Sequence, residues 1–212
     1  MKVCATQLAT VVAAVVATLP ASPAWAATAY TVDSAKSTLG FGATQTGAEF
    51  DGRFDKFRAQ IAFADADLPG SKFDVVVDTA SVNTADDERD TVLRGSDLFY
   101  VEKYPTARFV TTGFKRRAAG SYEATGKLTI RDVTREVQVP FTLMTVKEAG
   151  KSGAWLKGAA RLKRLDFGVG QGEWQDTSWV ADEVTVKFAL HLLPAAAPNV
   201  QKPTTPPAQT TK

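Results

Sequence analysis

The chain has 212 residues and a nearly balanced charge, with 25 lysines and arginines against 23 aspartates and glutamates. The basic residues are mixed with acidic ones and form no stripe, so nucleic-acid binding is not expected. The single histidine excludes a three-histidine metal site, and we expect no metal and no cofactor. Composition and charge therefore leave little material for catalysis.

The first 26 residues are typical of a secretory signal. Lys2 precedes an apolar run over residues 8–19, and Ala24-Trp25-Ala26 supplies the small residues of a cleavage site. The run is shorter than the roughly 20 residues of a membrane span. We expect cleavage after Ala26 and export of the protein. Cleavage removes Cys4, so the 186 residues that follow hold no thiol, and their length suits one domain over residues 27–193.

Alternation of apolar and polar residues predicts a β protein in the rest of the chain. A strand with one apolar and one polar face belongs to an antiparallel sheet. About eight such strands at short spacing predict a sandwich or a barrel, and composition does not choose between them. The alternation is clear over residues 57–63, 73–78, 122–130, 137–143 and 184–192, and weaker over 37–44, 107–114 and 153–163.

Residues 84–99 lack this alternation and predict a short helix between strands. Thr84, with Asp87 three residues later, resembles a helix N-cap. Asp86, Asp87 and Glu88 would then lie at the positive end of the helix dipole. Asp90 and Arg94 are four residues apart and can pair.

Two features near the C-terminus, His191 and the last 19 residues, also bear on function. His191 shares the polar face of the last strand with Thr185 and Lys187, which predicts a solvated imidazole and not a catalytic one. Residues 194–212 contain five prolines and few large apolar residues. Such a segment cannot bury enough surface to offset its ordering entropy, so a disordered tail is expected.

Several motifs occur in order between about Tyr30 and Leu192. They are Tyr30-Thr31-Val32-Asp33, Gly52-Arg53-Phe54 before Phe57, Ser81-Val82-Asn83-Thr84, Arg89-Asp90, Leu93-Arg94, Asp97-Leu98-Phe99, Lys103-Tyr104-Pro105, Arg108-Phe109, residues 126–134 and Asp166-Phe167-Gly168. Together these motifs resemble the YceI-like family of lipid- or polyisoprenoid-binding, lipocalin-like proteins of the bacterial periplasm, and the resemblance implies a periplasmic location. Two positions depart from the family pattern, because Lys36 and Val92 stand where it often has histidine, which argues against histidine catalysis.

The resemblance implies an all-β fold, an eight-stranded antiparallel lipocalin-like barrel with a short helix between strands and an elongated apolar cavity. It implies a ligand that is a long apolar lipid: a polyisoprenoid, a compound related to an isoprenoid quinone, or a fatty acyl lipid. The expected cavity residues are Phe63, Phe73, Val75, Val77, Phe109, Leu128, Ile130, Val139, Phe141, Leu143, Val186, Phe188 and Leu190. The expected head-group residues at the mouth are Lys36, Arg89, Arg94 and Arg131, with Trp174 and Trp179 as rim aromatics.

Alternatives remain open at this point. Apolar residues point inward at alternate positions both in a hollow barrel and in a barrel filled by its own side chains, so the pattern does not distinguish the two. The resemblance to the family favours a cavity. The arginines could instead form salt bridges that hold the helix to the barrel. The favoured function is a lipid carrier. Transient contact with a membrane or a membrane protein is compatible with this function, and so is a homodimer. An enzyme using carboxylates near Asp86–Asp90, and a structural or stress protein with a filled barrel, are the other hypotheses.

Overall fold

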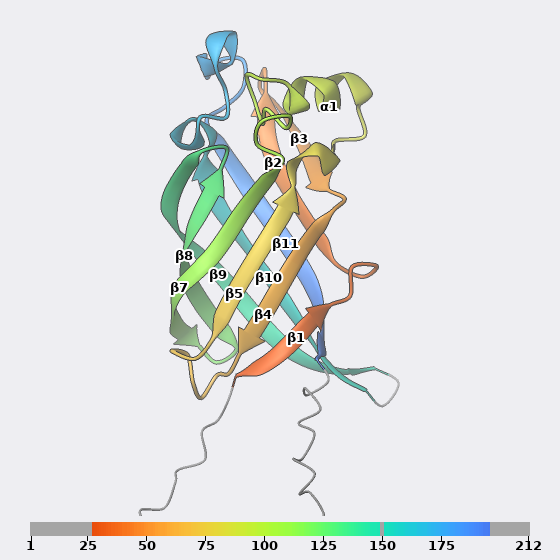
Figure 1. Cartoon of the computed structure of the whole chain (residues 1–212), viewed down its shortest axis with the longest axis vertical. Coiled ribbons are helices and arrows are strands. Elements are labelled where there is room, and N and C mark those ends of the chain that lie inside the picture. The colour runs from red at the N-terminus through yellow and green to blue at the C-terminus, as the bar shows by residue number, and fades with distance from the viewer. Residues whose placement is uncertain (1–26, 149–150, 196–212) are drawn as a thin grey trace, which may run out of the picture.

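Eight antiparallel strands close into a barrel, in the order β1–β4–β5–β7–β8–β9–β10–β11 and back to β1 (Figure 1). The computed structural model describes residues 27–148 and 151–195, so the predicted signal and most of the predicted tail lie outside the described residues. The predicted eight-stranded lipocalin-like barrel is confirmed. The strands are β1 (Thr28–Val32), β4 (Phe57–Phe63), β5 (Lys72–Asp78), β7 (Thr106–Ala118), β8 (Ser121–Ile130), β9 (Val133–Glu148), β10 (Lys151–Lys163) and β11 (Glu183–Pro194).

Three further strands extend the wall at one end: β2 (Thr38–Gln45), β3 (Ala48–Phe54) and β6 (Val82–Asn83). The last residues of β11 pair with β1, whereas its first half pairs with β2, from Thr185 opposite Gly42 to Ala189 opposite Thr38. Two strands therefore follow each other along the same edge of β11. The sequence did not predict β1 and β3, because β1 is short and β3 carries Glu49, Asp51 and Gly52, which are uncommon in strands.

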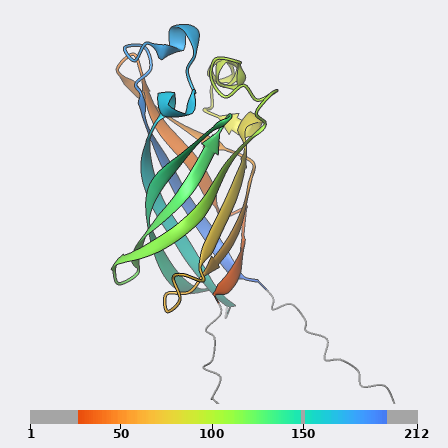
Figure 2. The same ribbon diagram turned by 60° about the vertical axis from the view of Figure 1, so that its left-hand side comes forward.

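The helical segments gather at the β2–β3 end of the barrel. They are α1 (Asp87–Arg94) and three 3₁₀ turns, η1 (Thr79–Ser81), η2 (Arg164–Phe167) and η3 (Gly172–Gln175). Figure 2 shows α1 and the η2–η3 segment on two sides of this end, and we call it the mouth.

The predicted helix is confirmed, but its predicted cap is wrong. Asp86 is the N-cap, and its carboxylate accepts a hydrogen bond from the backbone N–H of Arg89 at 3.0 Å. Thr84 instead donates from its backbone N–H and its hydroxyl to Asp90 Oδ1, each at 2.8 Å. The predicted pair of Asp90 and Arg94 is present at 3.8 Å. Helix α1 is thus fastened to the preceding segment by a carboxylate that is 5 % exposed.

The opposite end of the barrel is filled by an aromatic cluster. Ring centroids of contacting pairs lie 4.8 to 6.1 Å apart, mostly edge to face, which is a favourable aromatic geometry. Phe63, predicted to line the cavity, packs inside this cluster with 2 % exposure and is not among the residues that line the cavity described below. Leu143, also predicted to line the cavity, packs against the same core. The cluster comprises Phe63, Phe73, Phe114, Tyr122 and Phe141, and we call it the aromatic plug.

The prediction of a solvated His191 is also wrong. Its neighbours Leu190 and Leu192 face the core, so the imidazole lies on the outer face as predicted, yet it is only 2 % exposed. The turn between β1 and β2 covers it, with Asp33 Oδ2 3.3 Å from Nδ1, and the Trp155 ring lies 5.0 Å away. Alternation predicts on which face of a strand a side chain lies, but it does not predict whether a loop covers that face.

Candidate functional site: an apolar cavity with a mouth

The barrel encloses a cavity of about 170 Å³ above the aromatic plug. The side chains that line it are apolar apart from Arg108, whose guanidinium pairs with Asp74 at 2.6 and 2.9 Å. That pairing holds the pKa of the Asp74 carboxyl below its usual range. Apart from Phe63 and Leu143, all predicted cavity residues line this space: Phe73, Val75, Val77, Phe109, Leu128, Ile130, Val139, Phe141, Val186, Phe188 and Leu190.

Sequence reasoning missed part of the lining. Strand β10 contributes Leu156, Ala160 and Leu162. These residues are an even number of positions apart, so they lie on the same face of the strand and the alternation could have identified them. Phe99 also lines the cavity but comes from the segment after α1. No periodicity predicts such a residue, because its position depends on how the chain crosses the mouth.

Glycines opposite phenylalanines keep the interior open. Phe188 faces Gly158 in the β10–β11 register, and Phe41 faces Gly52 in the β2–β3 register. A Cβ at Gly158 would lie 2.5 Å from Cζ of Phe188, and one at Gly52 would overlap the Phe41 ring. The rings can therefore lie against the wall where the glycines have no side chain, and the centre of the barrel stays free.

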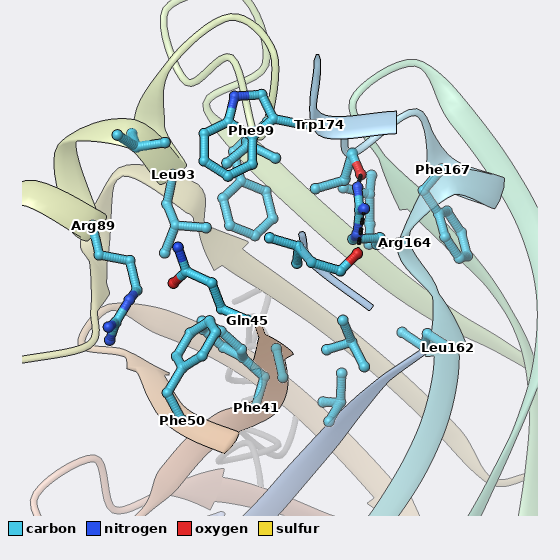
Figure 3. A pocket seen from close by; sticks show the side chains of 18 of the residues that line it. Phe41, Gln45, Phe50, Arg89, Leu93, Phe99, Leu162, Arg164, Phe167 and Trp174 are labelled. Atoms are coloured by element: carbon cyan, nitrogen blue, oxygen red, sulfur yellow. Dashed lines mark hydrogen bonds between the residues drawn. The ribbon is translucent and has the colours of Figure 1, made fainter. Parts of the chain in front are cut away.

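The mouth holds a second cavity of about 460 Å³ (Figure 3). Phe54, Phe99, Ile130, Leu162 and Val186 line both spaces, so the mouth cavity continues into the barrel. Its walls are built from β2 and β3, from α1, and from the segment around η2 and η3. The result is an apolar space that begins at the mouth and ends at the aromatic plug.

Polar groups lie among the apolar residues of the mouth. The Arg89 guanidinium lies 4.4 Å from the centre of the Phe50 ring and 3.5 Å from Asp86. Arg164, 7 % exposed, donates to the carbonyl oxygens of Ala181, Val169 and Val180 at 3.1, 3.0 and 2.7 Å. Burial lowers the pKa of Arg164 from its usual value. Arg164 thus holds the segment that follows it, whereas Arg89 borders open space (Figure 3).

Of the predicted mouth residues, Arg89 and Trp174 line the mouth cavity. Arg94 does not, because it donates to the carbonyls of Ala80 and Val82 at 2.9 and 2.7 Å and holds α1 against β6. Arg131 donates to the carbonyl oxygens of Ser96, Leu98 and Gly168 and so joins the two halves of the rim. Both arginines connect backbone segments, although through carbonyls more than through the salt bridges considered from sequence.

Lys36 and Trp179 also lie outside the mouth cavity. Lys36 belongs to the turn between β1 and β2, on the side of the barrel. Trp179 is 62 % exposed, and only its neighbour Val180 lines the cavity. The sequence could not separate these residues from Arg89 and Trp174, because all of them lie in or beside loops.

The carboxylates of α1 serve mainly local structure. Asp90 accepts two hydrogen bonds from Thr84 and pairs with Arg94, and Asp86 caps the helix. Glu88 lines the mouth together with Asp86. Within residues 27–148 and 151–195, no group of three histidine, cysteine, aspartate or glutamate side chains could hold a metal ion. No helix in the part of the chain that the structure describes has the length and apolarity to span a membrane.

A closed antiparallel barrel with one open end and an apolar interior defines the lipocalin-like class of proteins. The model of the YceI-like domain matches residues 30–192, and the chain belongs to that family. A UPF0312 protein of Vibrio parahaemolyticus is 30% identical over 145 residues, covering 66% of this chain and 77% of the relative. One of Pseudomonas aeruginosa is 36% identical over 120 residues, covering 56% of this chain and 62% of the relative.

Solved structures show the same fold. BcnA of Burkholderia cenocepacia is 36% identical, with a TM-score of 0.71 over 76% of this chain and 98% of BcnA. A polyisoprenoid-binding domain from Saccharophagus degradans is 18% identical, with a TM-score of 0.61 over 79% of this chain and 99% of that domain. At this identity the second likeness concerns the fold alone.

Proposed function

We propose that this protein binds a long apolar lipid inside its barrel and carries it through an aqueous compartment. The observation that carries the proposal is the apolar cavity between mouth and aromatic plug. A barrel filled by its own side chains would leave no such space. The name of the Saccharophagus relative, a polyisoprenoid-binding domain, points to the same ligand class. The ligand is a polyisoprenoid, a compound related to an isoprenoid quinone, or a fatty acyl lipid.

Burial of the chain supplies the affinity. Each buried methylene contributes about 0.8 kcal/mol, so about ten give roughly 8 kcal/mol before ordering costs. That corresponds to a dissociation constant of about 1 μM. Such binding needs no catalytic group and accepts chains of varied structure, whereas selectivity depends on a few polar groups at the opening. Arg89, over the Phe50 ring, is one such group.

Export to the periplasm belongs to the same proposal. The signal-like first 26 residues would place the protein between two membranes, where a long apolar chain cannot cross water unaided. A soluble barrel that hides the chain would serve such a compartment. Transient contact with a membrane or a membrane protein would then load and unload the ligand.

The test is native mass spectrometry of the protein purified from the periplasm, followed by organic extraction. A stoichiometric long-chain lipid is expected. A bare mass that does not change after incubation with isoprenoids and fatty acyl lipids would refute the carrier function, and the interior would then be treated as core. Mass spectrometry of the intact chain also reads the cleavage site, because retention of residues 1–26 would contradict removal of the signal.

Catalysis on the lipid is the second candidate, carried by the carboxylates near the mouth. Asp90 lies close to it but is hydrogen bonded to Thr84 and paired with Arg94. We infer binding alone, because a carboxylate engaged in this way is poorly placed for proton transfer. Asp90→Asn tests the inference. Loss of turnover of a bound lipid with binding retained would favour the enzyme.

A further inference from the structure

The wall of the barrel is interrupted on the side of β4. The pairing of β1 with β4 ends at Tyr30 opposite Ile61, and the pairing of β2 with β3 ends at Gly40 opposite Arg53. No register pair joins residues 31–39 to residues 54–60 among the described strands. The loop between β1 and β2 projects beside this stretch (the orange loop at the right of Figure 1). Two strand segments thus run past each other here without a ladder.

A third cavity, of about 690 Å³, lies at this interruption. Ser34, Ser37 and Thr38 line one side of it, and residues 53–58 line the other. Three apolar side chains, Leu39, Phe54 and Phe57, line both this space and the cavity inside the barrel. These three side chains lie between the third cavity and the interior of the barrel. We call the third cavity the side window.

Two of the positively charged side chains that line the side window have no ion-pair partner among the described residues. Arg53 and Asp55 neutralise each other at 2.6 Å, and hydrogen bonds from Asn83 and Arg53 keep the pKa of Asp55 below its usual value. Asp78 caps the N–H of Ala80 at 3.0 Å. The remaining charged residues that line the space are Lys56 and Arg58, both exposed. Neither takes part in an ion pair within the described residues.

The charges that line the mouth cancel, because Asp86 and Glu88 are matched by Arg89 and Arg164. The guanidinium of Arg89 already lies beside Asp86, and Arg164 donates to three carbonyl oxygens. An anionic group would thus find both cations of the mouth engaged, whereas at the side window it would meet Lys56 and Arg58, with Asp78 as the only anion of the lining that has no ion-pair partner.

We propose that the side window is a second opening of the barrel and holds the anionic head, a phosphate or carboxylate, of an amphiphile whose chain lies in the interior. Lys56 and Arg58 contact the head, and the chain enters the interior between Leu39, Phe54 and Phe57. This inference rests on the proposed lipid binding and adds the class of head group and its place.

The first test compares geranylgeranyl phosphate with geranylgeraniol, which has the same chain without the charge. The variant carries Lys56→Gln and Arg58→Gln. Its affinity for the phosphate is expected to fall about tenfold, since it loses two partly exposed ionic contacts, and its affinity for the alcohol should not change. The matched control carries Lys115→Gln and Lys127→Gln, exposed lysines of β7 and β8 that line none of the three cavities described above. The control has the same net charge and should bind both probes as the unchanged protein does.

The second test reads the place of the head without any variant. Lysines are acetylated with acetic anhydride and analysed by mass spectrometry, with Lys115 as internal reference. Geranylgeranyl phosphate should protect Lys56 and leave Lys115 reactive. Geranylgeraniol and inorganic phosphate, at the same concentration, should protect neither. Equal protection of Lys56 by inorganic phosphate would show a site for a free anion and overturn the proposal.

The remaining outcomes separate the two proposals. If both probes bind but neither affinity depends on Lys56 and Arg58, the side window holds no head and only this inference falls. An equal loss in the control variant would show a general effect of charge and would overturn it too. If neither probe binds the unchanged protein, the proposed lipid binding itself fails.

Discussion

Filling the interior should abolish lipid binding and at the same time stabilise the protein. Ala160 lines the cavity from β10, and Ala160→Phe places a ring in the free space. An empty volume in a core costs about 24 cal/mol per Å³. For a cavity of about 170 Å³ the gain is therefore limited to about 4 kcal/mol. One ring fills part of the space and loses some rotamer freedom, so we expect a gain of about 1–2 kcal/mol.

The assay is urea unfolding of delipidated protein, because a bound lipid would add its own stabilisation. Thermal unfolding should show a rise in Tm of about 2–4 °C per kcal/mol for a chain of this length. Binding of geranylgeraniol to the same samples should be lost. The gain in stability and the loss of binding are both needed for the reasoning to hold.

Ala154 provides the matched control. It lies on the same strand, is 1 % exposed and packs in the core around the aromatic plug. Ala154→Phe should overpack that core and cost about 1–3 kcal/mol. The reasoning is refuted if Ala160→Phe destabilises the protein as much as Ala154→Phe does. The interior would then be a packed core, and the cavity would not lower the free energy of unfolding.

Three further results are expected. Gly52→Ala should push the Phe41 ring into the mouth and weaken binding of geranylgeraniol, and unchanged binding would show that the ring can move elsewhere. Arg164→Met should lower the free energy of unfolding by about 3 kcal/mol, since one buried and two partly buried carbonyls lose their donor; a loss below about 1 kcal/mol would contradict this. Burial and a hydrogen bond to Asp65 raise the pKa of Tyr122 to about 12. Its neutral form therefore stabilises the fold fully below pH 10, and this contribution is lost as the pH rises toward 12. Absorbance at alkaline pH should show one late tyrosine ionisation that is absent in Tyr122→Phe.

The sequence predicted the number of barrel strands better than their identity. Eight strands were expected, and eight close the barrel, but β2 was among those predicted and β1 was not. Alternation in β1 is too short to detect, and the strand is specified by its partners Ile61 and Leu192, both distant in the sequence. A local pattern therefore predicts a half-buried face without showing which strand completes the barrel.

The interior was more predictable than the mouth for a physical reason. Residues such as Val75 and Phe188 lie on regular strands, so their direction follows from their parity. Arg89 and Arg94 lie on one short helix, and only the crossing of that helix over β6 decides that one borders the cavity and the other holds backbone carbonyls. His191 illustrates the same limit, because the loop that buries it comes from the other end of the sequence.

The aromatic plug closes one end of the barrel with Phe63, Phe73 and Phe141, so a chain cannot be threaded through the barrel from end to end. Both routes into the interior, the mouth and the proposed side window, lie away from the plug. A donor and an acceptor of the lipid would therefore both have to approach this part of the barrel, and neither would need a binding surface at the plugged end.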